Sequence, residues 1–387
     1  MNRLDPFHIM IVSKYFSTFT DIINLNLVCK KFCNNMMQFH YNPIPVTLQT
    51  LKHFPSLETL CIYSERDEHF LGYNSNTKNE KTTQHFDWYN NTNFFSICIF
   101  YAVHYSIFKE VKSKPNYSKI VFKNLVYTVS DRFIYKNVIP ENVKSLAEKC
   151  FERALLETPP YIPISVTSFS NSCFRVCSSL TSIKLPNNLK YLGDYCFQRC
   201  VYLLSIDIPS SVSKIGRTCF GTCKRLSKVN FCKCVEGDIS NKKCTRIIKL
   251  GGSCFIHCIS LSKILIPESV LKIGGSIFNG CLSLTEIKMN ECTLITSIPE
   301  LVFKNCVSLS TIELPSNIKN IGSETFRGCS SLEIIEIPKQ VTQIGYLCFF
   351  GCVSLEQLGV DTKTIQMGTN AFKGCKKLKL NSQENKT

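Results

Sequence analysis

Histidine is scarce in this chain, with seven residues in 387, and tryptophan occurs once. The sequence also contains no glycine-rich phosphate loop, no zinc-binding helix motif and no nucleophile elbow. Many catalytic sites depend on such motifs, because they place a nucleophile, a base or a metal ligand at a fixed spacing. We therefore expect a protein that is not an enzyme and that needs no cofactor.

Long apolar segments are missing as well. The longest, FFSICIFYAVHYSIF at residues 94–108, is interrupted by His104 and is shorter than the roughly 20 residues of a membrane-spanning helix. The start of the chain carries Asp5, His8 and Lys14 where a secretory signal peptide needs an uninterrupted apolar run. We expect no membrane partner and a cytoplasmic protein, with the nucleus as the alternative compartment.

Acidic residues are fewer than basic ones, since 29 Asp and Glu stand against 45 Lys and Arg and give a formal net charge of +16. Such an excess attracts nucleic acid or a membrane surface when the charges gather on one face. Cysteine is abundant, with 23 residues, and in a secreted protein that number would suggest disulfides. Because no signal peptide is recognised, we expect reduced thiols.

The cysteines belong to a repeated motif, Phe-x-x-Cys-x-x-Leu, which occurs as FRVCSSL, FGTCKRL and FRGCSSL among others. Ten repeat phenylalanines lie mostly 23 residues apart, with one step of 35 that carries an excess of 12 residues near CKCVEGDISNKK. They are Phe151, Phe174, Phe197, Phe220, Phe255, Phe278, Phe303, Phe326, Phe349 and Phe372. A fixed period of this length is typical of a solenoid, whose units bury their apolar positions only against neighbouring units.

Each unit, such as LTSIKLPNNLKYLGDYCFQRCVY at residues 180–202, combines a short alternating segment with a helix-like turn around the phenylalanine. Proline after the alternating segment cannot donate a strand hydrogen bond, so it ends the strand. The glycine that follows the second Ile or Leu permits a tight turn at positive φ. These features predict an α/β repeat fold in which short strands stack about 4.8 Å apart.

The unit resembles the 23-residue leucine-rich repeat of the BspA type over residues 143–380. It departs from the common leucine-rich consensus because it has no regular asparagine row. Prolines fall near the place where that row would begin: Pro186, Pro209, Pro267, Pro315 and Pro338. The resemblance implies a leucine-rich repeat solenoid that binds other proteins through its surface.

The repeat cysteines could serve either metal binding or packing. Some units carry a second cysteine four residues before the first, and paired thiolates attract zinc. Other units replace that second cysteine by Thr, Ile, Val or Ala, which a metal site would not tolerate. We therefore expect no metal and interpret the cysteines as small buried side chains. CFIHC, with Cys254, His257 and Cys258, is the best candidate for a metal or thiol–imidazole site.

The positions expected on the solvent face carry both signs of charge, as Lys184, Asp207 and Glu313 illustrate. One position that precedes the repeat glycine has lysine in three successive units, namely Lys214, Lys249 and Lys272. A nucleic-acid groove would need a longer basic row interleaved with aromatic residues, so we expect no nucleic acid. The three lysines form a small candidate contact patch for a protein.

Residues 4–33, LDPFHIMIVSKYFSTFTDIINLNLVCKKFC, predict two short amphipathic helices, the second capped by Thr20 or Asp21. This segment resembles an F-box, which implies docking of the adaptor subunit of cullin-type ubiquitin ligases. The matching positions are Leu4, Pro6, Ile11, Phe16, Leu25, Val28, Cys29 and Phe32. Asp5 departs from the F-box pattern because it separates the leucine from the proline. The other interpretation is a helical cap that closes the solenoid.

We expect four regions: an F-box-like helical segment or cap at residues 1–42, degenerate repeats with a polar insertion at 43–142, BspA-type repeats at 143–380, and a disordered tail at 381–387. The first functional hypothesis is a non-catalytic scaffold for protein–protein interaction, whose most specific form is a substrate receptor of a cullin-type ubiquitin ligase. The alternative, which other BspA-type proteins suggest, is a surface or adhesion protein that binds an extracellular partner.

Overall fold

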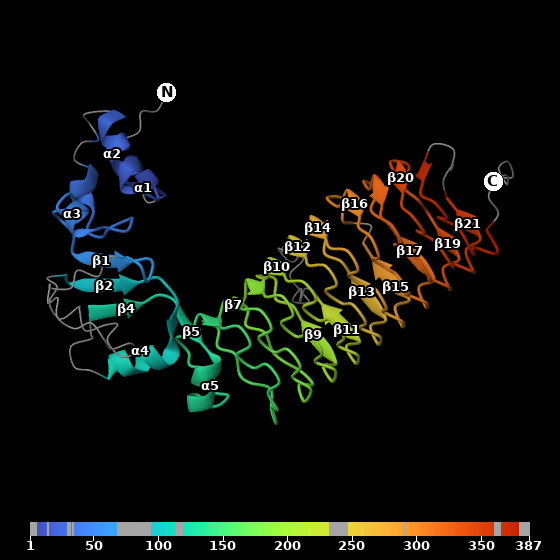
Figure 1. Ribbon diagram of the computed structural model, residues 1–387, viewed down its shortest axis with the longest axis horizontal. Coiled ribbons are helices and arrows are strands. Elements are labelled where there is room, and N and C mark those ends of the chain that lie inside the picture. The colour runs from blue at the N-terminus through green and yellow to red at the C-terminus, as the bar shows by residue number, and fades with distance from the viewer. Residues whose placement is uncertain are drawn as a thin grey trace, which may run out of the picture. The chain divides into compact units, whose positions relative to one another are not determined.

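The computed structural model describes residues 6–13, 15–28, 32, 35–67, 94–113, 119–231, 247–289, 291–359 and 365–378 (Figure 1). By its internal contacts the chain divides into two compact units, Met1–Val126 and Tyr127–Thr387. The expected tail, most of the polar insertion and the expected surface loop near residues 232–243 lie outside the described residues.

Unit 1 combines short helices with parallel strands. Its helices are α1 (Pro6–Ser13), α2 (Phe19–Val28), the 3-10 helix η2 (Asn35–Gln38), α3 (Leu48–Leu51) and α4 (Tyr105–Lys112). Its strands are β1 (Thr59–Ile62), β2 (Ser96–Ile99), β3 (Val103–His104), β4 (Ile120–Phe122) and the start of β5 (Leu125–Tyr127). β1, β2 and β4 pair in parallel, with Leu60 opposite Ile97 and Ile97 opposite Ile120.

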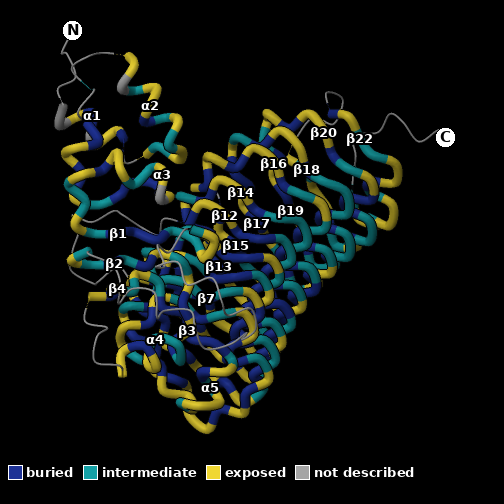
Figure 2. Tube along the Cα trace, turned by 60° about the vertical axis from the view of Figure 1, so that its left-hand side comes forward, coloured by how far each residue is buried: buried dark blue, intermediate teal, exposed yellow. Residues whose placement is uncertain are grey.

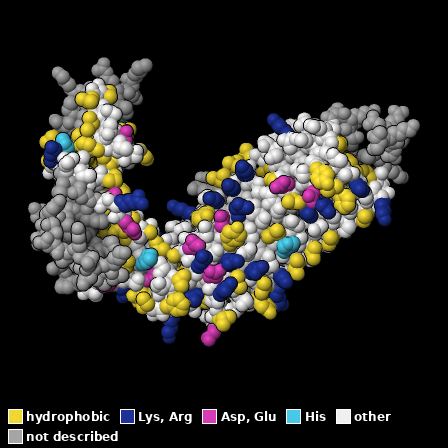
Figure 3. All heavy atoms as spheres, in the orientation of Figure 1, with side chains coloured by type: hydrophobic (Ala, Val, Ile, Leu, Met, Phe, Trp, Pro, Cys, Tyr) yellow, Lys and Arg dark blue, Asp and Glu magenta, His cyan; other side chains and the backbone are white. Residues whose placement is uncertain are grey.

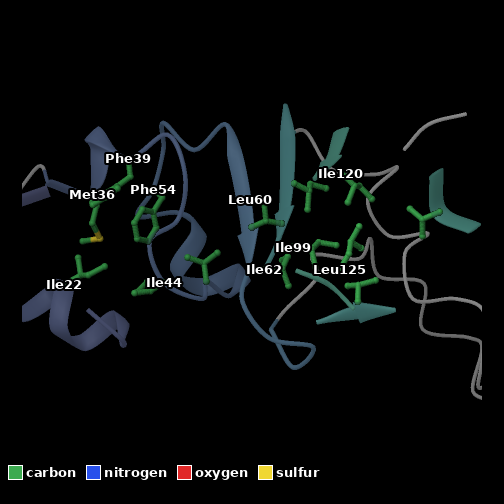
Figure 4. Packing of buried hydrophobic residues seen from close by; sticks show 14 residues of the cluster. Ile22, Met36, Phe39, Ile44, Phe54, Leu60, Ile62, Ile99, Ile120 and Leu125 are labelled. Carbon is green, nitrogen blue, oxygen red and sulfur yellow. The ribbon is translucent and has the colours of Figure 1, made fainter. Parts of the chain in front are cut away.

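One apolar core joins the helices of unit 1 to its strands (Figure 4). Ile22 of α2 and Phe39, just after η2, belong to the same buried cluster as Leu60 of β1 and Ile99 of β2. Asn42 fixes the connection, because its buried side-chain amide donates to the carbonyl of Cys61 at 2.7 Å and accepts from that residue's N–H. The helical segment and the first strands therefore share a single core.

Unit 2 begins with α5 (Val129–Tyr135) and continues as a stack of repeats that contribute two series of short parallel strands (Figure 1). The first strand row precedes the repeat phenylalanines and comprises β6 (Ser145–Leu146), β7 (Ser168–Phe169), β8 (Tyr191–Leu192), β10 (Lys214–Ile215), β12 (Lys249–Leu250), β14 (Lys272–Ile273), β16 (Ser297–Ile298), β18 (Asn320–Ile321), β20 (Gln343–Ile344) and β22 (Gln366–Met367). The second residue is buried in every strand of this row except β22, and the first is exposed except in β6, β7 and β8, where it is half-buried.

The second strand row follows the repeat cysteines. It comprises β9 (Ser205–Asp207), β11 (Lys228–Asn230), β13 (Lys263–Leu265), β15 (Glu286–Lys288), β17 (Thr311–Glu313), β19 (Ile334–Ile335) and β21 (Gln357–Leu358). β9 pairs with β11 and β13 pairs with β15, but β11 and β13 belong to separate sheets. This break coincides with the 35-residue step between Phe220 and Phe255.

The segment around each repeat phenylalanine is a hydrogen-bonded turn. The expectation of a helix-like turn is wrong, because the backbone there is not helical throughout. Two positions per repeat, two residues before and two residues after the phenylalanine, have left-handed backbone, as at Ser172 (φ 56°) and Val176 (φ 59°). A β-branched residue rarely adopts this conformation. Neighbouring repeats hold it in place, because the N–H of Val176 donates to the carbonyl of Gln198 at 2.8 Å.

The ten repeat phenylalanines stack on one another through the interior of unit 2. Figure 2 shows that buried and exposed positions alternate along the chain of this unit. From Phe151 to Phe372 every successive pair of rings is stacked, with centroids 4.9–5.8 Å apart. Nine of the rings are at most 1% exposed, whereas Phe372, the last, is partly exposed. The expectation that these phenylalanines lie inside a repeat solenoid is confirmed.

The repeat cysteines do more than fill space. The thiol of Cys329 donates to the carbonyl of Phe303 in the preceding repeat at 3.1 Å, and the same contact recurs from Cys177 to Cys375. Burial raises the pKa of the Cys329 thiol to about 12, so this group stays protonated and remains a donor. Cysteine therefore follows phenylalanine by three residues because it satisfies a buried carbonyl while occupying little volume.

The repeat glycines have a different role from the expected one. Gly193, Gly216, Gly251, Gly274, Gly322, Gly345 and Gly368 all lie outside the left-handed region. A Cβ atom on Gly251 would instead meet the backbone of Gly216 and Arg217 in the preceding repeat. Close approach of neighbouring backbones thus requires glycine here. Ala147, Ser170 and Pro299 occupy the equivalent position in three repeats, so the requirement is not uniform along the stack.

Candidate binding surface

The lysine row, defined as Lys214, Lys249 and Lys272, lies on three adjacent strands of the first strand row. Lys214 of β10 is in register with Lys249 of β12, which is in register with Lys272 of β14. All three side chains are exposed. Figure 3 shows Lys and Arg side chains gathered over this part of unit 2. The structure therefore brings together the three residues that the repeat spacing singled out.

Among the described residues, the lysine row has no acidic partner within ion-pair distance. The Nζ atom of Lys214 lies 5.1 Å from the centroid of the Tyr191 ring, the neighbouring residue in register on β8. Cation–π contacts of this kind orient a lysine without neutralising its charge. The row therefore presents its positive charge to solvent.

A second candidate surface is a shallow groove of about 550 Å³ on the second strand row. It spans β11, β13 and β15, so it includes the break between the two sheets. Here the charges are paired, because Glu286 lies 2.8 Å from the ammonium of Lys263 and 3.3 Å from that of Lys288. Hydrogen bonds from these two lysines lower the pKa of the Glu286 carboxyl. The groove therefore offers less free positive charge than the lysine row.

The F-box-like positions that the structure describes differ in burial. Leu4 and Cys29 lie outside the described residues, and Pro6 is the first residue of α1. Phe16 packs against the core of unit 1. The remaining positions range from half-buried to exposed: Leu25 and Phe32 are half-buried, Ile11 is 38% exposed and Val28 is 75% exposed.

Two neighbours of these positions, Ile23 and Leu27, are more prominent on α2 than most residues of the F-box match. Leu27 is 79% exposed and Ile23 is 40% exposed. Their spacing of four residues places them on one side of the helix. This i, i+4 spacing is visible in the sequence, although the motif match does not select it. Together with Val28 they give α2 an exposed apolar turn.

The CFIHC segment does not assemble a thiol–imidazole site. Cys254 and Cys258 are fully buried, whereas His257 is exposed. The Cys258 thiol donates to the carbonyl of Phe220 at 3.1 Å, and burial raises its pKa well above the usual value. Within the described part of the chain, no three His, Cys, Asp or Glu side chains are grouped so as to hold a metal ion. In that same part, none of the helices combines the length and apolar character that crossing a bilayer requires.

Comparison with known proteins agrees with this architecture. The BspA type leucine-rich repeat region family matches residues 103–227 and 248–379 in six copies. A leucine-rich repeat protein from Bacteroides ovatus is 23% identical with a TM-score of 0.50, and the match covers 83% of this chain and 77% of that one. A leucine-rich repeat protein from T. pallidum is 22% identical with a TM-score of 0.37, and the match covers 49% and 76%. No curated protein sequence matches this chain.

The family match begins at residue 103, so it takes in β3, α4 and β5 as well as the repeats recognised from residue 143 onward. It covers more than half of the chain, and the stacked phenylalanines, paired strand rows and thiol–carbonyl contacts are the structural form of its repeat. Proteins of this family and fold are typically non-enzymatic scaffolds. The chain is therefore a member of the BspA-type leucine-rich repeat family.

Proposed function

We propose that this protein is a non-catalytic scaffold in which the repeat stack binds one protein and the N-terminal helices dock another. The observation that carries the proposal is the pair of exposed strand rows in unit 2. Their inward residues build the core, so their outward residues, such as Lys249, Ser297 and Asn320, are free to vary for recognition. A stack of parallel strands offers a broad and preformed surface for this purpose.

The more specific form of the proposal is a substrate receptor of a cullin-type ubiquitin ligase. In this form the exposed turn of α2 contacts the adaptor subunit, and the strand rows hold the substrate. Two features support it: the F-box-like sequence and the exposed apolar side chains of Leu27 and Val28. Exposed apolar anchors supply much of the binding energy of protein interfaces.

Leu27→Asp should weaken binding of the purified adaptor subunit to the full-length chain by about tenfold or more, because a charge would replace an apolar anchor. Leu27 is 79% exposed, so the melting temperature should stay close to that of the wild type. The measurement is a pull-down at micromolar concentration, with circular dichroism to monitor folding.

The matched control is Leu265→Asp, which makes the same change at a residue of β13 that is 60% exposed and should leave adaptor binding intact. Wild-type chain that fails to retain the adaptor, or a Leu27→Asp variant that retains it fully, would remove the ligase role. Either result would leave the scaffold function of the repeat stack in place.

Membership of the BspA-type family fits equally well a surface protein with an extracellular partner. The thiols favour an intracellular scaffold, because all 18 cysteines that the structure describes are free and 16 of them are buried. An oxidising compartment would expose so many thiols to disulfide exchange whenever the chain unfolds. We therefore propose a reducing compartment, the cytoplasm.

A further inference from the structure

We propose that the lysine row is the binding site for an acidic segment of a protein partner, an inference that rests on the scaffold function and specifies its ligand. Like charges directly opposite on neighbouring strands are unfavourable for folding. Lys249 nevertheless has Lys214 on one side and Lys272 on the other, in register. In later repeats the same position is neutral, as Ser297 and Asn320 show. An anionic ligand would relieve this repulsion.

The backbone beside the lysine row supplies a second, independent feature. Three residues after the lysine-row position, the N–H of Asp194 donates to Oδ1 of Asn171 at 2.9 Å, and the N–H of Arg217 donates to Oδ1 of Asp194 at 2.8 Å. In these repeats a side-chain oxygen of the preceding repeat accepts each N–H. The equivalent residues in the next two repeats are Gly252 and Gly275, the glycine pair.

The glycine pair lacks such acceptors. Arg217 precedes Gly252 in the stack and has no acceptor atom in its side chain, and Gly252, which precedes Gly275, has no side chain. Neither N–H has a hydrogen-bond partner among the described residues. Neither glycine has positive φ, so the backbone conformation does not require glycine at these positions. The N–H groups of Gly252 and Gly275 therefore lack acceptors in the same repeats in which Lys249 and Lys272 lack acidic partners among the described residues.

This coincidence occurs at no other place in the described repeats of the first strand row. Further along, the N–H groups of Glu300, Ser323 and Tyr346 likewise have no hydrogen-bond partner among the described residues, but lysine is absent from the strand position in those repeats. Among the described residues of this edge, Asp194 accepts the N–H of Arg217, and Glu300 lies one repeat beyond Gly275. Residues 232–246, which lead into β12, carry four basic and two acidic residues, so their net charge is also positive.

The dimensions favour a short acidic segment over nucleic acid. Three neighbouring strands span only about 10 Å, which matches two or three carboxylate or phosphate groups on one peptide. A single strand of nucleic acid binds along a longer basic groove in which aromatic rings stack on its bases. The aromatic side chain beside the row, Tyr191 on β8, already lies against the ammonium of Lys214. The ligand chemistry is therefore that of clustered carboxylate or phosphate groups on a protein.

Fluorescence anisotropy with labelled peptides and the full-length chain tests this site. An oligoglutamate peptide and a phosphoserine peptide should bind, and an oligoglutamine peptide should not bind. The tighter of the two acidic peptides shows whether carboxylate or phosphate groups supply the negative charge. The double variant Lys249→Ser, Lys272→Ser should lose about tenfold in affinity. Gly252→Asn changes no charge, and its amide oxygen would accept the N–H of Gly275, so it should lose about threefold.

The matched control is Lys224→Ser, which removes the same charge from an exposed turn outside both candidate surfaces and should bind as the wild type does. Equal losses in this control and the double variant, or a Gly252→Asn variant with unchanged affinity, would overturn the site. Tighter binding of a single-stranded oligonucleotide than of either acidic peptide would overturn the ligand class. A protein partner that binds wild type and double variant equally would overturn this inference while the scaffold function stands.

Discussion

Phe255→Ala is expected to lower the free energy of unfolding by about 3–5 kcal/mol, the usual cost of removing a buried ring. Phe255 is fully buried and stacks on Phe220 at 5.5 Å and on Phe278 at 5.7 Å. Its loss would interrupt the stack in the middle of unit 2, where no solvent can fill the apolar gap. Urea unfolding followed by circular dichroism measures the change.

Phe372→Ala is the matched control for this prediction. The same substitution is made here at the end of the stack. The Phe372 ring stacks on Phe349 and is partly exposed. We expect it to cost less than half as much as Phe255→Ala. Equal costs at the two positions would mean that the phenylalanine stack does not hold the repeats together.

Gly251→Ala should destabilise the protein by about 3 kcal/mol, at the upper end of the range for overpacking. The added Cβ would meet the backbone of Gly216 and Arg217, which cannot move aside as a flexible side chain would. The neighbouring Gly252→Ala provides the control, since its Cβ would lie 3.3 Å from the carbonyl oxygen of Gly275, a contact that needs a shift of only a few tenths of an ångström.

Thermal and urea unfolding of the two alanine variants show which of two reasons requires glycine at position 251: the close approach of neighbouring backbones, or the conformation of the turn. Neither glycine has positive φ, so a conformational requirement would predict little effect at either position. A Gly251→Ala variant as stable as Gly252→Ala would contradict the close approach of neighbouring repeats.

The period of the phenylalanines was enough to predict the repeat fold, because a ring that recurs every 23 residues can be buried only by its own copies. The same register placed Lys214, Lys249 and Lys272 on adjacent strands despite the insertion between the first two. Both inferences depend only on the regular repetition of one unit along the stack, and the repeat spacing in the sequence shows this repetition directly. The family match and the buried rings confirm the fold.

The local backbone could not be predicted in the same way. Val176 adopts left-handed backbone that its own preference opposes, because hydrogen bonds to the next repeat impose that conformation. The role of Gly251 depends on the distance between the backbones of neighbouring repeats. The conformational preferences of single residues do not predict that distance. The separation of β11 from β13 likewise appears only when both strand rows are placed in space.

The N-terminal helices show a further limit of sequence reasoning. The F-box resemblance selected Phe16 as a docking residue, yet it packs against the core that α2 shares with β1. Phe16 lies between α1 and α2, and its burial depends on how these helices pack on the strands that follow. Because Leu27 of α2 is far more exposed than Phe16, we take Leu27 as the candidate contact in place of Phe16. Ile23, four residues before Leu27 on α2, lies on the same side of that helix.

The central claim is that this scaffold binds a protein through the exposed strand rows of unit 2, of which the first carries the lysine row. Site-specific photo-crosslinking from full-length chain tests it most directly, with the crosslinker at Ser297 of β16 and, as control, at the exposed Lys224 in a turn. We predict a discrete crosslinked partner from position 297 alone, identified by mass spectrometry and shown to bind the chain as a purified protein. The same partner from both positions, or from Lys224 only, would contradict the claim.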